Sequence, residues 1–328
     1  MSIPLYPLTF QPIFKERVWG GRNLERLFDK KLPENAVIGE SWEISDRPGD
    51  VSVIDFGGLK GTTLHDLIAE RTEEVMGNAS LLEGRFPLLV KILDAQDKLS
   101  LQVHPPKEVA SKLGGDSKTE MWYIADCTDN ADLFVGLRSG MTRAEFEKQV
   151  EAGAVARCFH RIDVKVGDSM FLPSGRVHAI GAGNVIFEIQ ENSDTTYRVH
   201  DWDRVGLDGK PRELHLEESM ESIAFDDYEP SLAPATMNVL ADGVEGRTLA
   251  DCREFNVAHL HLAENREFKV GNRDTATVVG VISGTLTIEG GGLARRLTRG
   301  QFSLLPASVD GSLRSSTGGG ACLVGTCR

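Results

Sequence analysis

Cysteine is scarce in this sequence, and long hydrophobic runs are absent. The five cysteines are scattered along 328 residues and form no Cys-x-x-Cys pair, which argues against a disulfide framework or a zinc-thiolate site. No stretch approaches the ~20 consecutive apolar residues that a membrane-spanning helix needs. The first residues, MSIPLYPLTFQPIF, lack the basic segment and apolar run of a secretion signal. We therefore expect a cytoplasmic protein without a membrane partner.

Basic residues are also in deficit. The chain has 36 Lys and Arg against 49 Asp and Glu, and its formal net charge is -13. Nucleic acids and anionic membranes attract basic surfaces, so neither is expected as the main partner. A small anionic substrate remains compatible with this composition where basic residues cluster locally.

Helical patterns are few, and most of the sequence has the pattern of short strands. Runs of β-branched and apolar residues bounded by Gly, Pro, Asp or Asn recur, as in 51–58, 183–194 and 277–292. A βαβ fold would need a helix between successive strands, so a sandwich or barrel is favoured. The length and the 41% hydrophobic content can supply two cores. We predict an all-β protein with two β-barrel or jelly-roll domains.

Three segments are exceptions with helical patterns, at 62–77, 104–115 and 140–153. The last has the capping-box pair Thr142 and Glu145 and forms a short helical insertion. The acidic, turn-rich segment 217–248 lacks alternation and is the best linker candidate. We place the boundary at about residue 235, which predicts an N-terminal domain over 1–235 and a smaller C-terminal domain over 236–328.

One motif resembles the second motif of the cupin superfamily, Gly-x5-Pro-x-Gly-x2-His. The four defined positions of this motif are occupied by Gly167, Pro173, Gly175 and His178. The spacing predicts a strand, a turn at Pro173 and Gly175, and a second strand that directs His178 into the barrel. The motif usually ends in Asn, whereas this chain has Ala182 there.

Four residues around this motif form a candidate metal site. Gln102 and His104 are two apart, so their side chains share one face of a strand. Glu120 precedes a hydrophobic strand, and His178 is the motif histidine. Taken singly, a histidine beside prolines is more often a turn residue and a glutamate is more often solvated. Together, two imidazoles and two oxygen donors suit zinc, with Mn, Fe or Co as alternatives.

Several segments then identify a family resemblance. They resemble type I mannose-6-phosphate isomerases of the short bacterial form, in the family's order, at 14–24, 38–46, 86–106, 118–126, 172–181 and 188–204. The resemblance implies a cupin fold, a small phosphorylated sugar as the partner, and interconversion of mannose 6-phosphate and fructose 6-phosphate through an enediol or enediolate. It implies one zinc ion per chain held by Gln102, His104, Glu120 and His178. We also expect a monomer.

The resemblance also places residues around the substrate. It implies that Arg198 is the active-site arginine and that Ser100, Lys118 and Lys91 lie in or beside the pocket, with Ser100 and Lys118 the better phosphate candidates. Lys118 is two residues before Glu120 and so shares its face of a strand.

The residues themselves support two catalytic candidates. Alternation over 187–194 directs Glu188 inward, which makes it our candidate base over Lys118 and His200. The fixed guanidinium of Arg198 suits a phosphate or an enediolate oxygen; the alternative is a surface ion pair with Asp194, Asp201 or Asp203. We expect Arg198 to act on the enediolate and Lys118 on the phosphate.

The C-terminal part repeats the shape of the motif without its ligands. Val278 and Gly311 stand where a glutamate and a histidine would be needed, so no second metal site is expected. His259 and His261 fit an alternating strand with outward or partly buried rings. Two other functions remain open, a cupin oxygenase or other metalloenzyme and a sugar-binding bicupin without activity. The metal that copurifies and an isomerase assay would separate them.

Overall fold

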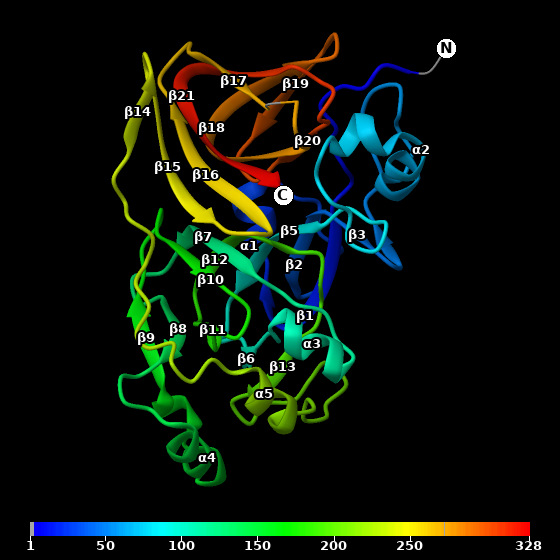
Figure 1. The fold of residues 1–328 in the computed structure, drawn as a ribbon. Helices are drawn as coiled ribbons and strands as arrows, with labels where there is room; N and C mark the ends of the chain where they lie inside the picture. Colours follow the sequence, from blue (N-terminus) through cyan, green and yellow to red (C-terminus); the bar gives the residue numbers. More distant parts are fainter. Residues whose placement is uncertain (1–2, 272) are drawn as a thin grey trace.

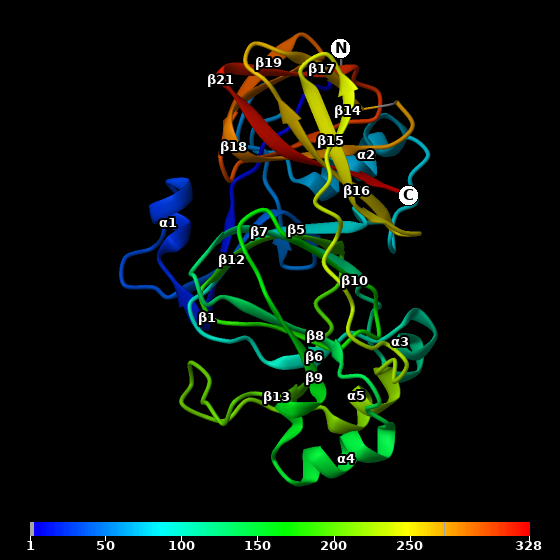
Figure 2. The same cartoon turned by 90° about the vertical axis from the view of Figure 1, so that its left-hand side faces the viewer.

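The computed structural model describes residues 3–271 and 273–328, and it consists mainly of antiparallel strands (Figure 1). Its larger sheets form three layers, which Figures 1 and 2 show from two directions. The third sheet, from the C-terminal part of the chain, packs on one side of the first sheet. The second sheet lies on the other side. The predicted all-β class is confirmed.

The first sheet is the middle layer, and its central strands are buried along their whole length because both faces are covered. Its strands are, in spatial order, β1 (Ile13–Gly21), β2 (Ile38–Ile44), β5 (Leu88–Ala95), β12 (Asn184–Glu191), β7 (Glu120–Cys127) and β10 (Ser169–Leu172). One face carries apolar side chains such as Val90 and Phe187 into a core shared with the third sheet. The other face carries Lys91 and Glu188 toward the second sheet.

The second sheet is smaller and contributes shorter strands. Its order is β13 (Tyr197–His200), β6 (Leu101–Val103), β11 (His178–Ile180), β8 (Asp132–Leu137) and β9 (Phe159–Asp163). A separate ribbon pairs β3 (Asp46–Arg47) with β4 (Asp50–Val51). Apolar residues of β7, β8 and β11 fill a second core between the first two sheets.

The third sheet contains all the remaining strands. Its order is β14 (Asn238–Ala241), β15 (Val244–Asp251), β16 (Phe255–Leu262), β21 (Gly311–Cys327), β18 (Thr277–Gly290) and β19 (Leu293–Thr298), with β17 (Glu267–Val270) on β21 and β20 (Phe302–Leu305) on β18. Within the described ranges the sheets stay open. The described strands therefore form the predicted all-β class as packed open sheets and no closed barrel.

The helices lie outside the sheets. They are α1 (Asn23–Phe28), α2 (Leu64–Met76), α3 (Lys107–Leu113), α4 (Arg143–Glu151) and α5 (Leu216–Ser222), with a 3-10 helix at Val155–Cys158. The three predicted helices are confirmed as α2, α3 and α4. Thr63 and Thr142 cap α2 and α4 by accepting a backbone N–H, and Gly114 ends α3 in the left-handed conformation. Sequence analysis missed α1 and α5, which begin without a side-chain cap.

The segment 217–248 is more structured than a linker. It contains most of α5, all of β14 and the start of β15, so only 223–237 crosses between sheets without a helix or a multi-residue strand. The boundary at about residue 235 stays a prediction; the third sheet begins at Asn238. No helix of the described residues is both long enough and apolar enough to cross a membrane.

Candidate active site

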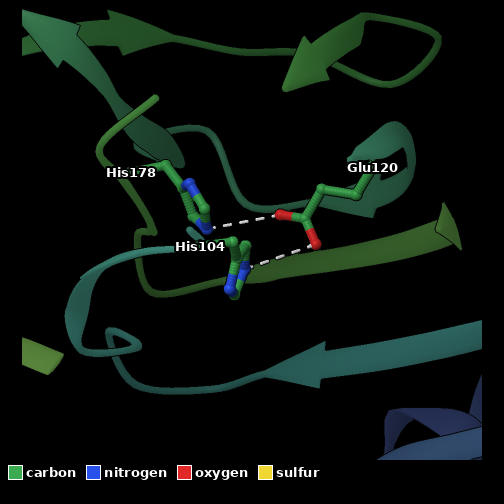
Figure 3. Close-up of side chains that lie close together, drawn as sticks. All are labelled: His104, Glu120 and His178. Atoms are coloured by element: carbon green, nitrogen blue, oxygen red, sulfur yellow. Dashed lines mark ion pairs between the residues drawn. The ribbon is translucent and has the colours of Figure 1, made fainter. Parts of the chain in front are cut away.

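Three of the four predicted metal ligands meet between the first and second sheets. His104 follows β6, Glu120 begins β7 and His178 begins β11, and Figure 3 shows both rings directed at the carboxylate. The Nε2 atom of His178 lies 3.3 Å from Glu120 Oε1, and the Nε2 atom of His104 lies 3.7 Å from Glu120 Oε2. All three side chains are buried, and their ligand atoms lie within 4.8 Å of one another.

Backbone carbonyls orient both imidazoles. Nδ1 of His104 lies 2.8 Å from the carbonyl oxygen of Thr195, and Nδ1 of His178 lies 2.9 Å from that of Arg176. A carbonyl only accepts, so each Nδ1 donates its proton and each Nε2 keeps a lone pair directed at Glu120. Burial lowers the pKa of both rings, to about 3 for His178. Both therefore stay neutral at pH 7, the form that binds metals.

Gln102 lies next to this group. Its backbone pairs with His178 across β6 and β11, its Nε2 atom is 3.2 Å from His178 Nε2, and its Oε1 atom accepts from the Ser100 hydroxyl at 3.2 Å. A half-turn of the amide about its last bond directs Oε1 toward His178 Nε2, the orientation that a metal ligand needs.

The turn of the cupin-like motif supports His104 as well as His178. The N–H of Gly175 donates to the carbonyl oxygen of His104 at 2.8 Å, and Gly175 has a φ of +91°. Glycine adopts this conformation without strain. A Cβ there would also lie 3.3 Å from Pro106 and from the carbonyl oxygen of Ser222. The motif glycine thus holds two strands with metal-ligand candidates together.

The donor set fits a divalent metal ion. Glu120 Oε1 is buried without a hydrogen-bond partner in the described part of the chain, as expected of an atom that serves a cation. Glu120 Oε2 accepts from Lys118 Nζ at 2.7 Å, and this ammonium also lies 3.1 Å from His104 Nε2. Burial lowers the pKa of Lys118, but Glu120 and Glu188 outweigh it, so the net pKa is raised and the ammonium stays charged.

A cavity of about 540 Å³ adjoins this group between the first and second sheets. All the predicted substrate and catalytic residues line this cavity, namely Lys91, Ser100, Lys118, Glu188 and Arg198. The predicted metal ligand Gln102 lines it too. The sequence therefore identified residues that share one pocket although they come from five strands or their flanking segments. His200, the other candidate base, is not among the lining residues and packs against Trp202.

Glu188 lies in the floor of the pocket between Lys91 and Trp122, its register partners on the neighbouring strands. The indole Nε1 of Trp122 donates to Glu188 Oε2 at 2.8 Å, and Lys91 Nζ lies 3.4 Å from Oε1. Oε1 is buried and has no hydrogen-bond partner among the described residues. Burial, and then the charge of Glu120, raises the pKa of Glu188. A carboxylate with one fixed and one free oxygen and a raised pKa is suited to proton transfer.

Sequence analysis missed several pocket residues, and Glu40 is the clearest case. Glu40 accepts from the Trp42 indole at 2.7 Å and from Arg17 at 2.9 Å, and Lys91 Nζ lies 3.9 Å away. Lys91 thus lies between two carboxylates, those of Glu40 and Glu188. The signal was available, because Glu40 lies in 38–46, one of the segments that carry the family resemblance.

Arg198 reaches the pocket from β13, where it pairs with Gln102 on β6. Its NH1 atom donates to the carbonyl oxygen of Glu213 at 2.7 Å. In the described ranges it forms no ion pair, and Asp201 pairs with Arg204 and Arg212 instead. The alternative of a surface ion pair for Arg198 is therefore not realised.

The third sheet offers no comparable group of ligands. Val278 is fully buried in the core, His261 is exposed, and His259 is partly buried with its ring on Tyr123 at 5.6 Å. Within the residues that the structure describes, the group of His104, Glu120 and His178 is the one set of three His, Cys, Asp or Glu residues close enough to hold a metal.

Known proteins resemble this chain over nearly its whole length. The sequence model of the phosphomannose isomerase type I catalytic domain matches residues 8–136. Mannose-6-phosphate isomerase ManA of Bacillus subtilis is 39% identical, with 92% of this chain and 93% of the relative covered. The mannose-6-phosphate isomerase of Streptococcus mutans is 35% identical over 92% of this chain and 93% of its own.

A solved structure agrees with the sequence relatives. The crystal structure of the mannose 6-phosphate isomerase from Bacillus subtilis superposes with a TM-score of 0.88 at 31% identity, covering 98% of this chain and 99% of that one. The likeness therefore includes the third sheet, which lies beyond the residues matched by the catalytic-domain model. This chain belongs to the type I mannose-6-phosphate isomerase family of enzymes.

Proposed function

We propose that this chain interconverts mannose 6-phosphate and fructose 6-phosphate by moving a proton between C1 and C2 through an enediol or enediolate, with one zinc ion per chain. The observation that carries the proposal is Glu188, a buried carboxylate that lines the pocket together with Gln102 and Lys118. Gln102 contacts His178, and Lys118 contacts His104 and Glu120, so the pocket adjoins the candidate metal group. A base and a metal in one enclosed site are what an aldose-ketose isomerisation requires.

The metal would be held by four residues, Gln102, His104, Glu120 and His178. Zinc suits two neutral imidazoles with oxygen donors. When bound, the metal would supply a Lewis acid that polarises the sugar oxygens at C1 and C2. Lys118 donates to Glu120 and so orients the carboxylate, as the two backbone carbonyls orient the imidazoles.

Glu188 would act as the base. Its Oε1 atom removes the proton from C2 of the aldose, which leaves an enediolate across C1 and C2, and returns that proton to C1. A second proton passes from the C2 hydroxyl to the C1 oxygen, which completes the ketose. Trp122 keeps Oε2 in place during both steps, so only Oε1 meets the substrate.

Lys91 would keep this base ready. Its ammonium lies between Glu40 and Glu188, and a positive charge 3.4 Å from Oε1 favours the ionised carboxylate that burial disfavours. The phosphorylated sugar would be contacted by Ser100, Lys118 and Arg198, which line the same cavity. We further expect a cytoplasmic monomer that binds neither nucleic acid nor membrane.

Two measurements test this proposal. Fructose 6-phosphate formed from mannose 6-phosphate can be coupled to NADP reduction, and elemental analysis gives the metal content. We expect turnover that a chelator abolishes and zinc restores, with one zinc per chain. A second tightly bound ion, or full activity in the metal-free protein, would contradict the proposal.

A further inference from the structure

A groove of about 610 Å³ lies between helices α4 and α5, with the end of α3 beside them. Figures 1 and 2 show these helices at the end of the molecule opposite the third sheet. Phe146 of α4 and Ile223, which follows α5, pack on the second sheet and attach both helices to it. Among the described residues, the groove and the cavity of the candidate active site share no lining residue. The groove is therefore a separate surface of the molecule.

The floor of this groove is apolar. Four apolar side chains from three helices line it: Leu113, Val150, Leu216 and Met220. Leu216 is exposed, and the other three are half-buried. Leu216 and Met220 are one helical turn apart, so they form a short apolar stripe on α5. Apolar side chains that meet at the surface are stabilised when a partner covers them.

The rim of the groove is acidic. Two glutamates of α4 and three of α5 form it: Glu147, Glu151, Glu217, Glu218 and Glu221. Arg143 is the one basic residue of the described lining, and it pairs with Glu147 at 3.3 Å and with Glu221 at 3.4 Å. The other three glutamates have no ion pair within the described ranges. Three carboxylates thus remain free to pair with cations of a partner.

The sign of these charges selects the occupant. Nucleic acids and anionic membranes carry the same sign as the rim and are repelled by it. A second copy of this chain has the same net charge of -13, and a two-fold contact would place one acidic rim against the other. A partner with an apolar stripe flanked by Lys or Arg matches both the floor and the rim.

The shape of the groove selects a helix. Its walls are two helices, and at ~1.5 Å per residue the nine residues of α4 make a wall roughly 14 Å long. A third helix packs between two others at interaxial distances of ~8–10 Å. Apolar residues at helical spacing, about one turn apart, would reach the floor along this length.

We propose that the groove between α4 and α5 docks a cationic amphipathic helix of a partner protein. The apolar face of that helix covers Leu216 and Met220, and its flanking Lys or Arg side chains pair with Glu151, Glu217 and Glu218. This interaction lies outside the catalytic pocket and does not depend on the proposed function.

The test uses a fluorescein-labelled synthetic peptide and the full chain. The peptide has ~14 residues of leucine and lysine, with the leucines at helical spacing. Fluorescence anisotropy should show binding with a micromolar Kd. The combined change Glu217→Gln and Glu218→Gln should weaken it by roughly 10-fold, because two charges of the rim are lost. No binding to the wild type, or an unchanged affinity in this variant, overturns the proposal.

Two single variants extend the test to the floor and to the other wall. Met220→Gln should weaken binding by ~10-fold, because it makes the floor polar. Glu151→Gln should weaken it by ~3-fold, the scale of one exposed ion pair. Glu151 is the last residue of α4, where a negative charge is unfavourable, so its removal leaves the helix stable. Glu151→Gln therefore decides the matter if the variants in α5 do not fold.

Matched controls separate docking from attraction to an acidic protein. The combined change Glu70→Gln and Glu245→Gln removes the same charge from exposed positions outside the groove. It should leave the affinity unchanged, and a loss equal to that of the Glu217 and Glu218 variant overturns the proposal. A peptide of the same composition with strictly alternating leucine and lysine should bind ~10-fold more weakly, because as a helix it has no apolar face. Equal binding of the two peptides also overturns it.

The other possible occupants give different results. A second copy would make the wild type a dimer in light scattering and Met220→Gln a monomer. A membrane would give sedimentation with phosphatidylserine vesicles that Met220→Gln abolishes. Either result overturns the assignment of a cationic partner helix.

Discussion

At the scale of single residues, the two oxygens of Glu188 have different surroundings. Oε2 is held by the Trp122 indole, whereas Oε1 is buried and free of hydrogen bonds among the described residues. Pairing with Lys91 offsets part of the rise in pKa that burial causes. Burial thus favours the protonated carboxyl of Glu188, and the charge of Lys91 favours the ionised one.

Replacing Glu188 with Gln should remove the proposed base and leave the pocket nearly intact. The amide oxygen can still accept from Trp122, but it cannot take a proton from C2. We expect kcat to fall by ~10²–10⁴-fold, the usual contribution of a general base, with little change in KM. Steady-state kinetics of the metal-loaded variant measure both.

A second buried glutamate provides the control for this substitution. Glu43 on β2 pairs with Lys30 at 2.8 Å and does not line the pocket. The Glu43→Gln variant should lose stability because it weakens a buried ion pair, and it should keep its kcat. If Glu188→Gln kept a kcat within a few-fold of the wild type, another group would have to be the base.

At the scale of elements, residues 190–195, which comprise the end of β12 and the turn after it, link the protein core to the candidate metal group. The Gln190 amide donates to the carbonyl oxygens of Glu191 and Ser193, each at 2.7 Å. The Asn192 amide donates to the carbonyl oxygens of Asp46 and Phe86. The same segment presents the carbonyl of Thr195 to His104.

Changing Asn192 to Ala should weaken metal binding without removing any ligand. The loss of two buried hydrogen bonds lets the segment shift, so the His104 ring loses its fixed orientation. Substitutions beyond the ligands themselves commonly cost 10–100-fold in metal affinity, and we expect ~10-fold here. Competition with a chromophoric chelator measures the affinity.

Thr195→Ala is the matched control for the segment. It removes the hydroxyl that accepts from the Asp116 N–H but leaves the carbonyl that orients His104. We expect the metal affinity of this variant to stay close to that of the wild type. Equal losses in Asn192→Ala and Thr195→Ala would show that the segment acts only through overall stability.

Local signals in the sequence determine which elements could be predicted. Thr63, Thr142 and Gly114 mark helix ends through their own hydrogen bonds or backbone conformation, and those helices were predicted. Helices α1 and α5 begin without a side-chain cap, and the residue that ends α1 in the left-handed conformation is Asp29 and not a glycine. Their formation depends on packing, which a local pattern does not contain. The sequence predicted barrel or jelly-roll domains without deciding between closed and open sheets, because barrel closure depends on pairing between distant strands.

Local sequence signals also decided which residues of the candidate site could be predicted. The spacing of Gln102 and His104, and the motif before His178, identified ligand candidates that the structure brings together with Glu120. Arg212, which also lines the cavity, was missed because it lies in an irregular loop, where no periodicity indicates which way a side chain points. Its place in the pocket follows from the hydrogen bonds to Asp201, a contact between residues 11 apart.

At the scale of the whole molecule, the third sheet and the first sheet share one hydrophobic core. This core includes Phe28 and Phe187 from the N-terminal part and Phe302 from the C-terminal part, with the ring of Phe187 close to both others. Hydrogen bonds cross the same junction, from Arg299 to the Ala125 carbonyl and from Arg247 to the Gly167 carbonyl. The strands that carry Glu120 and Glu188 are therefore supported by the third sheet from behind.

His259 makes this junction sensitive to pH. Its ring packs on Tyr123 of β7, and burial, followed by the charges of Arg247 and His261, lowers the pKa of His259 to about 4. The unfolded chain binds this proton at the ordinary value of 6.5, so it binds more protons than the folded chain between pH 6.5 and 4. The stability from a neutral His259 is complete above pH 6.5 and is lost as the pH falls toward 4.

Replacing His259 with Gln should flatten this part of the stability profile. With partial exposure of the ring allowed for, we expect the loss in unfolding free energy between pH 7 and pH 5 to shrink by about 1 kcal/mol. Urea unfolding at the two pH values measures the difference. His261→Gln, at an exposed position on the same strand, is the control and should keep the wild-type profile. If the two variants lose stability equally with falling pH, the junction is not titrated through His259, and the pH response must come from other buried groups such as His104 and His178.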